Sequence, residues 1–202
     1  MPISHEHNLI FIHIPKTAGT SIEKALDLQK ESCLYKRGKY KNYPVCPQHL
    51  FLSEIIEEVP DAKTYIAFSV IRNPFDRFVS EFLYYNQTYW SKKYHNLKFE
   101  DFIDVALKLS PEERRYAFDG HLELQIDYLN YNIPTNVFKF EDLNQGKLEK
   151  WLLKNYNLSI KIPHENKNKN RLTYNHYYTT QSSIDKVSEF YAKDLEAFYY
   201  KF

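Results

Sequence analysis

Cysteine is scarce in this sequence, and neither sign of charge dominates. The 202 residues include only two cysteines, Cys33 and Cys46, which have no spacing typical of a metal site and no histidine cluster beside them. Without a secretion signal, two reduced thiols are expected in preference to a disulfide. Lys and Arg number 27 and Asp and Glu number 26, and the resulting charge of +1 excludes a bulk basic field for nucleic acid. Any basic site must therefore be local.

A long hydrophobic run is also missing. The N-terminal stretch "MPISHEHNLIFIHIP" has no basic start, and its apolar run "LIFIHI" is far shorter than the ~20 residues that cross a membrane. We therefore expect a soluble, cytoplasmic protein with no transmembrane segment and no nucleic-acid partner. The chain is 43% hydrophobic, which suffices for one sizeable core, and it shows no internal repeat and no dividing linker. These features predict a single domain over residues 1–202.

Short apolar runs alternate with amphipathic stretches along the chain. The predicted strands are Asn8–His13, Thr64–Arg72 and Asn136–Phe140. The predicted helices are Ser21–Leu28, His49–Val59, one that starts at Pro74 after the cap residue Asn73, Phe99–Leu109, one from Ser110 towards Tyr128, Leu148–Tyr156 and Ile184–Phe198. The predicted loops are Lys30–Pro47 and Asn157–Thr180. This alternation predicts the α/β class, with a mostly parallel sheet flanked by helices.

The segment "HIPKTAGTS", His13 to Ser21, lies between a predicted strand and a predicted helix. A nucleoside-triphosphate loop has the pattern G-x-x-x-x-G-K-[ST], with its lysine after the last glycine, whereas Lys16 precedes Gly19 here. The backbone N–H groups of such a loop and of the first helical turn favour an anion. The segment therefore predicts an anion site that differs from the nucleoside-triphosphate type.

A second strand-to-helix junction carries Arg72 at the end of a strand and Ser80 on the following helix. Asp76 and Ser80 are i, i+4 neighbours on the polar flank of that helix, which lets Ser80 reach a ligand. Because the carboxyl ends of parallel strands lie on one edge of a sheet, the two junctions are expected to bind two anionic groups of one ligand. The planar guanidinium of Arg72 suits a terminal phosphate, and the compact ammonium of Lys16 suits a leaving oxygen.

Together, "IFIHIPKTAGTSIEKAL" and "VIRNPFDRFVSEF" resemble the sulfotransferases, specifically the carbohydrate-type group (sulfotransferase family 2-like) and its soluble bacterial relatives. "QHLFLSEI", "VFKFEDL", "PHENKNKNR" and "YAKDLEAFYYKF" resemble the family in the same order, so the likeness covers nearly the whole chain. The resemblance implies a P-loop-NTPase-like fold, a sulfuryl donor, 3′-phosphoadenosine 5′-phosphosulfate (PAPS), its desulfated product PAP, and no metal. The first motif then binds the 5′-phosphosulfate and the second the 3′-phosphate. The residues that this likeness assigns to the cofactor are Lys16, Thr17, Ala18, Gly19, Thr20, Ser21, Arg72 and Ser80.

The acceptor hydroxyl must lose its proton, and histidine is the side chain that best suits this step at neutral pH. The resemblance places a base at His49, so Lys16 and His49 are the predicted catalytic residues. His13, which ends the first predicted strand, and His121 are the alternative bases. If no histidine acts, the carboxylate of Glu123 is the next candidate.

Several other side chains are candidates for ligand contact. His121 and Gln125, spaced i, i+4, are expected to share a helical face that meets the acceptor. Arg171 is a candidate for folding over the adenine or the 3′-phosphate, as a late loop does in the related enzymes. His5 and His7 are expected in a frayed terminus. The aromatic candidates for stacking on a sugar are Tyr84, Tyr85, Tyr89 and Trp90.

The expected acceptor is a hydroxyl compound, with a carbohydrate or glycoconjugate, such as a small glycan or a glycolipid precursor, as the favoured class. The shared motifs specify neither the acceptor, which depends on loops, nor the oligomeric state. Two other functions stay open: a nucleotide-dependent kinase or NTPase on a related fold, and a protein that binds PAP or PAPS without turnover. The position of Lys16 and the lack of a Walker-type Asp at a strand end count against the first of these.

Overall fold

The computed structural model describes residues 3–28, 42–87, 97–163 and 172–202. The chain forms two compact units, each assembled from two separate segments. The first unit comprises Met1–Arg72 and Asp127–Lys167, and the second comprises Asn73–Ile126 and Asn168–Phe202. Within the described ranges, no helix combines the length and the apolar character that a membrane span needs.

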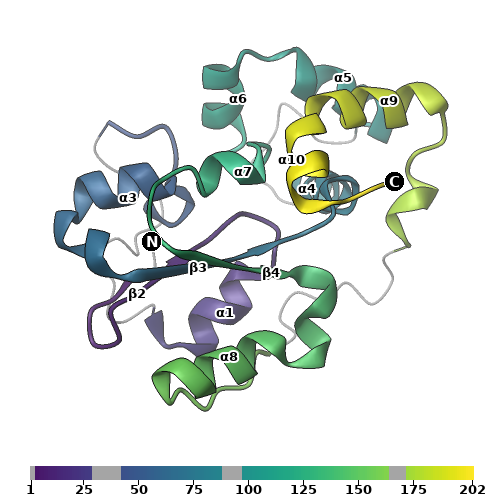
Figure 1. The fold of residues 1–202 in the computed structure, drawn as a ribbon. Coiled ribbons are helices and arrows are strands. Elements are labelled where there is room, and N and C mark those ends of the chain that lie inside the picture. The colour runs from purple at the N-terminus through teal and green to yellow at the C-terminus, as the bar shows by residue number, and fades with distance from the viewer. Residues whose placement is uncertain (1–2, 29–41, 88–96, 164–171) are drawn as a thin grey trace. The chain divides into compact units, whose positions relative to one another are not determined.

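The first unit is built on a four-stranded sheet with the order β1-β2-β3-β4 (Figure 1). The strands are β1 (Ile3–Ser4), β2 (Leu9–Ile12), β3 (Ile66–Ile71) and β4 (Thr135–Lys139). Strands β2, β3 and β4 are parallel, with Phe11 opposite Phe68 and Val70 opposite Phe138, whereas β1 pairs antiparallel with β2. A mostly parallel sheet is therefore confirmed.

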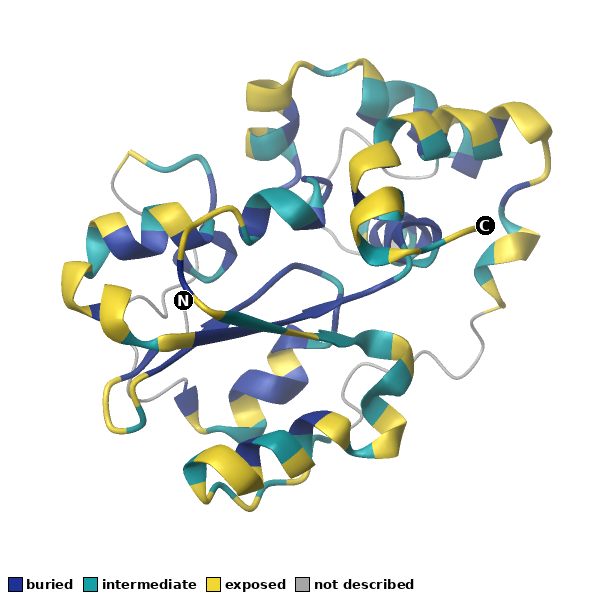
Figure 2. Cartoon of the chain, in the orientation of Figure 1, coloured by how far each residue is buried: buried dark blue, intermediate teal, exposed yellow. Residues whose placement is uncertain are grey.

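Burial on both faces explains why β2 and β3 are nearly continuous apolar runs in the sequence, and Figure 2 shows β2 and most of β3 as buried. On one face, Phe11 and Phe68 belong to a core cluster that includes residues of α1 (Gly19–Ala25) and α8 (Lys147–Tyr156). Burying each such side chain contributes about 1.5–3 kcal/mol to stability. Helix α3 (Leu52–Glu58) lies on the opposite side of the sheet (Figure 1). The described residues of this unit also form the 3₁₀ helices η1 (Pro47–His49), η2 (Pro60–Thr64) and η3 (Phe140–Gln145).

The second unit is helical in its described residues. Its elements are α4 (Pro74–Gln87), α5 (Phe99–Lys108), α6 (Pro111–Ala117), η4 (Tyr174–His176), α9 (Gln181–Phe190) and α10 (Ala192–Phe198), while α7 (Gln125–Tyr128) crosses the boundary between the units. Its core is aromatic: the rings of Phe78 and Phe102 lie 5.4 Å apart at 62°, an edge-on contact that favours aromatic packing. The predicted starts of α4 and α6 are confirmed, since Asn73 Oδ1 accepts from the backbone N–H of Phe75 at 3.0 Å and Ser110 Oγ accepts from that of Glu113 at 3.3 Å.

The predicted fold class, α/β with a mostly parallel sheet flanked by helices, is confirmed. Several predicted boundaries are wrong for a common reason, a backbone turn that apolar periodicity does not reveal. The helix predicted to reach Leu28 ends at Ala25, and Asp27 has a left-handed φ of 53°. The helix predicted from Ser110 towards Tyr128 ends at Ala117, and Asp119 follows with a φ of 50°.

Three further expectations needed correction. The last predicted helix is two helices, α9 and α10, which meet at the buried Tyr191. The helix predicted from His49 begins at Leu52, because Pro47–His49 forms the separate 3₁₀ helix η1. The N-terminus is not frayed at His5, whose Nδ1 lies 2.9 Å from the hydroxyl of Tyr65 beside strand β1.

Candidate cofactor and catalytic site

The loop between β2 and α1 is held in an unusual backbone conformation. Lys16 and Ala18 have φ values of 69° and 74°, in the left-handed region that costs a non-glycine residue roughly 1–2 kcal/mol. The hydroxyl of Thr17, which is fully buried, donates to the carbonyl of Ile14 at 2.8 Å and closes the turn. Backbone strain of this kind is characteristic of functional sites, because the surrounding structure must maintain it.

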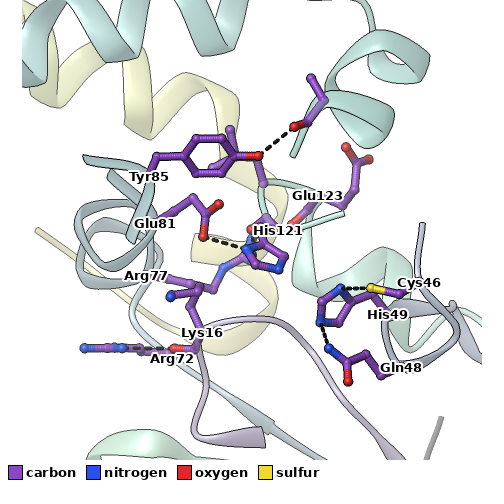
Figure 3. A network of polar contacts seen from close by, with 12 residues as sticks. Lys16, Cys46, Gln48, His49, Arg72, Arg77, Glu81, Tyr85, His121 and Glu123 are labelled. Atoms are coloured by element: carbon purple, nitrogen blue, oxygen red, sulfur yellow. Dashed lines mark hydrogen bonds and ion pairs between the residues drawn. The ribbon is translucent and has the colours of Figure 1, made fainter. Parts of the chain in front are cut away.

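Arg72 holds the same loop from the end of β3. Its Nη1 donates to the carbonyl oxygen of Lys16 at 2.9 Å (Figure 3). Its guanidinium carbon lies 4.1 Å from the ring centre of Phe140. Only 7% of Arg72 is exposed. The two sequence motifs therefore meet in the structure, as the parallel order of β2 and β3 predicts. That the arginine of the second motif supports the backbone of the first was not predicted.

His13 and Glu23 form a buried pair at the other side of the loop. His13 Nδ1 lies 2.6 Å from Glu23 Oε1, and the two residues are 5% and 1% exposed. The imidazole stacks on Phe11 with a centroid distance of 5.8 Å. His13 is an alternative base predicted from the sequence, whereas its partner Glu23 was not predicted, because a separation of ten residues between a strand end and a helix has no local pattern.

Gly19 lies directly against this imidazole. A Cβ atom at Gly19 would come within 2.0 Å of Nε2 and Cδ2 of His13, closer than real Cβ contacts allow. The glycine of the first motif is therefore required by a neighbouring side chain within the protein. This is a reason that the loop pattern alone does not reveal.

His49, the predicted base, is the last residue of η1 and is only 4% exposed. Its Nδ1 lies 3.6 Å from the sulfur of Cys46, and its Nε2 lies 3.2 Å from the amide nitrogen of Gln48 (Figure 3). The ring also meets that of His13 edge-on, with centroids 5.2 Å apart at 87°. The structure thus gathers His13, His49 and Cys46, although the sequence showed no histidine cluster beside the cysteines.

The remaining predicted cofactor residues differ in accessibility. In the loop and α1, Thr20 is exposed, Lys16 and Ala18 are half-buried, and Ser21 is 3% exposed. Ser80 is half-buried on α4 in the second unit, on the polar flank predicted for it. Four residues named in the sequence analysis lie outside the described ranges: Arg171, Tyr89, Trp90 and Cys33.

The second unit contains its own histidine–carboxylate pair. His121 Nδ1 lies 2.7 Å from Glu81 Oε2, and the side chains are 12% and 0% exposed (Figure 3). A carboxylate at this distance from Nδ1 favours the tautomer with the proton on Nδ1. The expected shared helical face of His121 and Gln125 is wrong, because His121 lies in a turn before α7, whose first residue is the buried Gln125.

Charged groups buried around this pair have structural partners. Arg77, 1% exposed, donates from Nη1 to the carbonyl of His121 at 3.0 Å and from Nη2 to the carbonyl of Glu123. The carboxylate of Glu123, the alternative base, lies 3.5 Å from Nε of Arg114 and forms an ion pair with it. Asp194 accepts from the backbone N–H of Gln125 at 2.8 Å, and burial raises the pKa of its carboxyl above the ordinary value.

The sugar-stacking candidates that the structure describes lie on α4 in the second unit. The ring of Tyr84 lies 5.6 Å from that of His121 and is 40% exposed as a residue, so it is accessible to a ligand. Tyr85 packs against Phe118 at 4.8 Å and donates its hydroxyl to the carbonyl of Ala117 at 2.6 Å. Tyr84 therefore has the more accessible ring of the two.

Comparison with known proteins shows the family of the chain. Searches among curated proteins and among solved structures find no match to the chain. The model of the sulfotransferase family matches residues 1–201 and so covers nearly its whole length. The match takes in the strained loop, Arg72 and the histidine pairs described above. The chain therefore belongs to the sulfotransferase family, and sulfuryl transfer is the activity that this membership supports.

Proposed function

We propose that residues 1–202 act as one domain that transfers the sulfuryl group of PAPS to a hydroxyl of a carbohydrate or glycoconjugate. The observation that carries the proposal is the contact between the two motifs, in which Arg72 Nη1 donates to the carbonyl of Lys16 at 2.9 Å. This contact joins the guanidinium of Arg72 to the backbone of the loop that carries Lys16, at the carboxyl ends of adjacent parallel strands, where ligands of α/β proteins bind. A donor with a phosphosulfate and a separate phosphate needs such a pair of cationic groups.

The chemistry of the loop residues fits PAPS. Lys16 in the strained loop is half-buried, and Thr20 in the first turn of α1 is exposed, so neither residue is fully enclosed by the protein. The hydroxyl of Thr17 is buried and bonded to Ile14, so we assign this side chain to holding the loop in shape, and Thr17 would contact the cofactor through its backbone. Lys16, Ala18, Gly19, Thr20 and Ser21 would hold the 5′-phosphosulfate, while Arg72, Ser80 and Arg171 would hold the 3′-phosphate side.

PAPS supplies an activated sulfuryl group when it is bound. Lys16 would neutralise the negative charge that grows during transfer, because a fixed cation in a site with little water stabilises developing charge strongly. Arg72 would act through its planar fork, which suits a phosphate, and through its hold on the Lys16 carbonyl. Neither role requires a metal ion.

We assign the base to His49. It is buried at the end of η1, and its ring contacts His13, which itself lies against the cofactor loop at Gly19. Its Nε2 faces the amide nitrogen of Gln48, so accepting a proton there requires the Gln48 side chain to turn away. His121 is the second candidate, favoured by the carboxylate of Glu81 at its Nδ1, an arrangement that fixes the tautomer of a base.

We assign the protein to the cytoplasm and its acceptor to the class of small glycans or glycolipid precursors, with no nucleic-acid partner. A near-neutral net charge of +1 supports the exclusion of nucleic acid. The exposed ring of Tyr84 supports an acceptor with an apolar sugar face, because aromatic rings pack against such faces.

The proposal is tested by calorimetric titration with PAP and with ATP·Mg²⁺, followed by transfer of labelled sulfate from PAPS to a panel of glycans and glycolipid precursors. We expect PAP to bind, ATP·Mg²⁺ to show no tight binding, and at least one hydroxyl acceptor to be labelled. Lys16→Ala is the matched control, and it should lose transfer by about 10²–10³-fold while its PAP affinity falls less. Tight ATP·Mg²⁺ binding without PAP binding would favour a kinase or NTPase, and PAP binding without labelling of any acceptor would favour a binding-only protein.

A further inference from the structure

The loop proposed to bind PAPS is strained at two places. Lys16 and Ala18, with φ values of 69° and 74°, are in a conformation that ordinary residues avoid. A loop in this state keeps its shape only if neighbouring groups hold it. Arg72 holds one end through the Lys16 carbonyl, and Thr17 bonds back to Ile14 in the middle. The end next to Gly19 needs a support of its own.

The imidazole of His13 occupies the space on that side. The three ring atoms closest to a Cβ placed on Gly19 are Cδ2 and Nε2 at 2.0 Å and Cε1 at 2.6 Å. Because a glycine φ in the left-handed region is not involved at Gly19, the contact with the ring is the obstacle to a side chain there. The ring and the glycine backbone therefore fit together as a pair.

Glu23 fixes the ring in this position. Its carboxylate lies 2.6 Å from His13 Nδ1 and comes from α1, one turn after Gly19. The pair is almost fully buried, with Phe11 stacked on the imidazole. Since Nδ1 is engaged by Glu23, the ring presents its Nε2 and Cδ2 edge to Gly19. The end of β2 is thereby joined to the start of α1 across the loop.

We infer that His13 is the positioning residue of the cofactor loop and that Glu23 orients it, so that the buried pair holds the Lys16–Gly19 backbone ready for PAPS. The inference rests on the proposed function, because it assigns a role in PAPS binding. His13 acts through the loop and does not itself take the acceptor proton. Its edge-on contact with His49, at 5.2 Å between ring centres, also connects the loop to the proposed base.

A double-mutant cycle between Gly19 and His13 tests the inference. Gly19→Ala should weaken PAP binding by about 10–100-fold, because the added methyl displaces the ring and with it the loop. His13→Ala should weaken PAP by about tenfold through loss of the support. In Gly19→Ala/His13→Ala the methyl finds the space left by the ring, so the loss should stay near that of His13→Ala alone.

Gly146→Ala is the matched control for a destabilising change at a glycine of the same unit. Gly146 has a φ of 67°, and a methyl group there would have only a carboxylate oxygen of Glu149 nearby, 4.0 Å away, so alanine strains the backbone without touching His13. Its PAP affinity should match the wild type, and His13→Ala should not improve it. Glu23→Gln, which keeps an acceptor for Nδ1, should retain most PAP affinity, whereas Glu23→Ala should resemble His13→Ala.

All affinities are measured by calorimetry well below the melting temperature of each variant, which separates binding from folding. Additive losses in the Gly19/His13 cycle would overturn the inference, as would a His13→Ala variant that melts earlier but binds PAP like the wild type. Either result leaves the proposed function standing, since the wild type binds PAP in both. Absence of PAP binding by the wild type overturns the proposed function and the inference together.

Discussion

The two units each contain a buried arginine and a histidine–carboxylate pair, but they use them differently. In the first unit, Arg72 and His13 both contact the loop between β2 and α1, through the Lys16 carbonyl and the backbone of Gly19. In the second unit, Arg77 contacts the carbonyls of His121 and Glu123, which lie in the turn before α7. The first set of contacts shapes the loop that carries Lys16, whereas the second holds a turn against the core.

Burial of a charge therefore does not by itself mark a catalytic group in this chain. A guanidinium that donates to two backbone carbonyls stabilises the fold, because unpaired buried carbonyls are destabilising. The same side chain beside a strained loop, with a lysine in that loop, has a ligand-related explanation. The partners of each charge therefore separate binding from stability in this chain.

The largest expected effect compares the histidines of the two units. His49→Ala should reduce turnover by about 10²–10⁴-fold, the usual contribution of a positioned base, while PAP affinity stays nearly unchanged. Turnover is measured with labelled PAPS and a fixed acceptor, and PAP affinity by calorimetry.

His121→Ala is the matched variant in the second unit, and we expect it to keep turnover within about tenfold of the wild type. The opposite pattern, near-normal turnover for His49→Ala and a large loss for His121→Ala, would move the base to the pair of His121 and Glu81. If both variants remain active, neither histidine is the base, and Glu123 becomes the next residue to test despite its ion pair with Arg114.

Substitution of the two buried arginines, Arg72 and Arg77, should affect two different quantities, PAP affinity and the free energy of unfolding. Arg77→Met should lower the free energy of unfolding by about 3 kcal/mol, because the carbonyls of His121 and Glu123 lose a buried donor. Arg72→Met should mainly weaken PAP, by about 2–4 kcal/mol, through loss of a phosphate contact and of the bond to Lys16. Denaturant unfolding and PAP calorimetry on both variants provide the measurements. If both variants lost only stability, Arg72 would be a structural residue like Arg77.

The sequence predicted those features that depend on local pattern or on strand order. The β2 and β3 strands, the caps at Asn73 and Ser110, and the meeting of the two motifs all follow from apolar runs, capping residues and parallel topology. The turns at Asp27 and Asp119 could not be predicted, because a left-handed residue interrupts a helix without changing its apolar periodicity.

The two histidine–carboxylate pairs could not be predicted from the sequence, for a different physical reason. Glu23 with His13 and Glu81 with His121 are joined by tertiary packing, and neither pair has a spacing that a helix or strand imposes. The motif also concealed why it needs Gly19. The structure supplies a reason, the imidazole of His13, with which a Cβ atom at Gly19 would collide.

The smallest expected effect tests whether the two units unfold together. Ser110→Ala removes the cap of α6, where the Ser110 side chain accepts from Glu113 N at 3.3 Å and donates to Glu113 Oε2 at 2.8 Å. Losing such a cap costs about 1 kcal/mol. Ser110 lies in the second unit and far along the sequence from the cofactor loop, so PAP affinity should not change. If the units unfold as one, intrinsic fluorescence and the loss of PAP binding should shift to lower denaturant by the same amount, since a cooperative transition shares every local loss. If only the fluorescence transition shifts, while PAP binding is lost at the same denaturant concentration as in the wild type, the second unit unfolds independently of the loop held by Arg72 and His13.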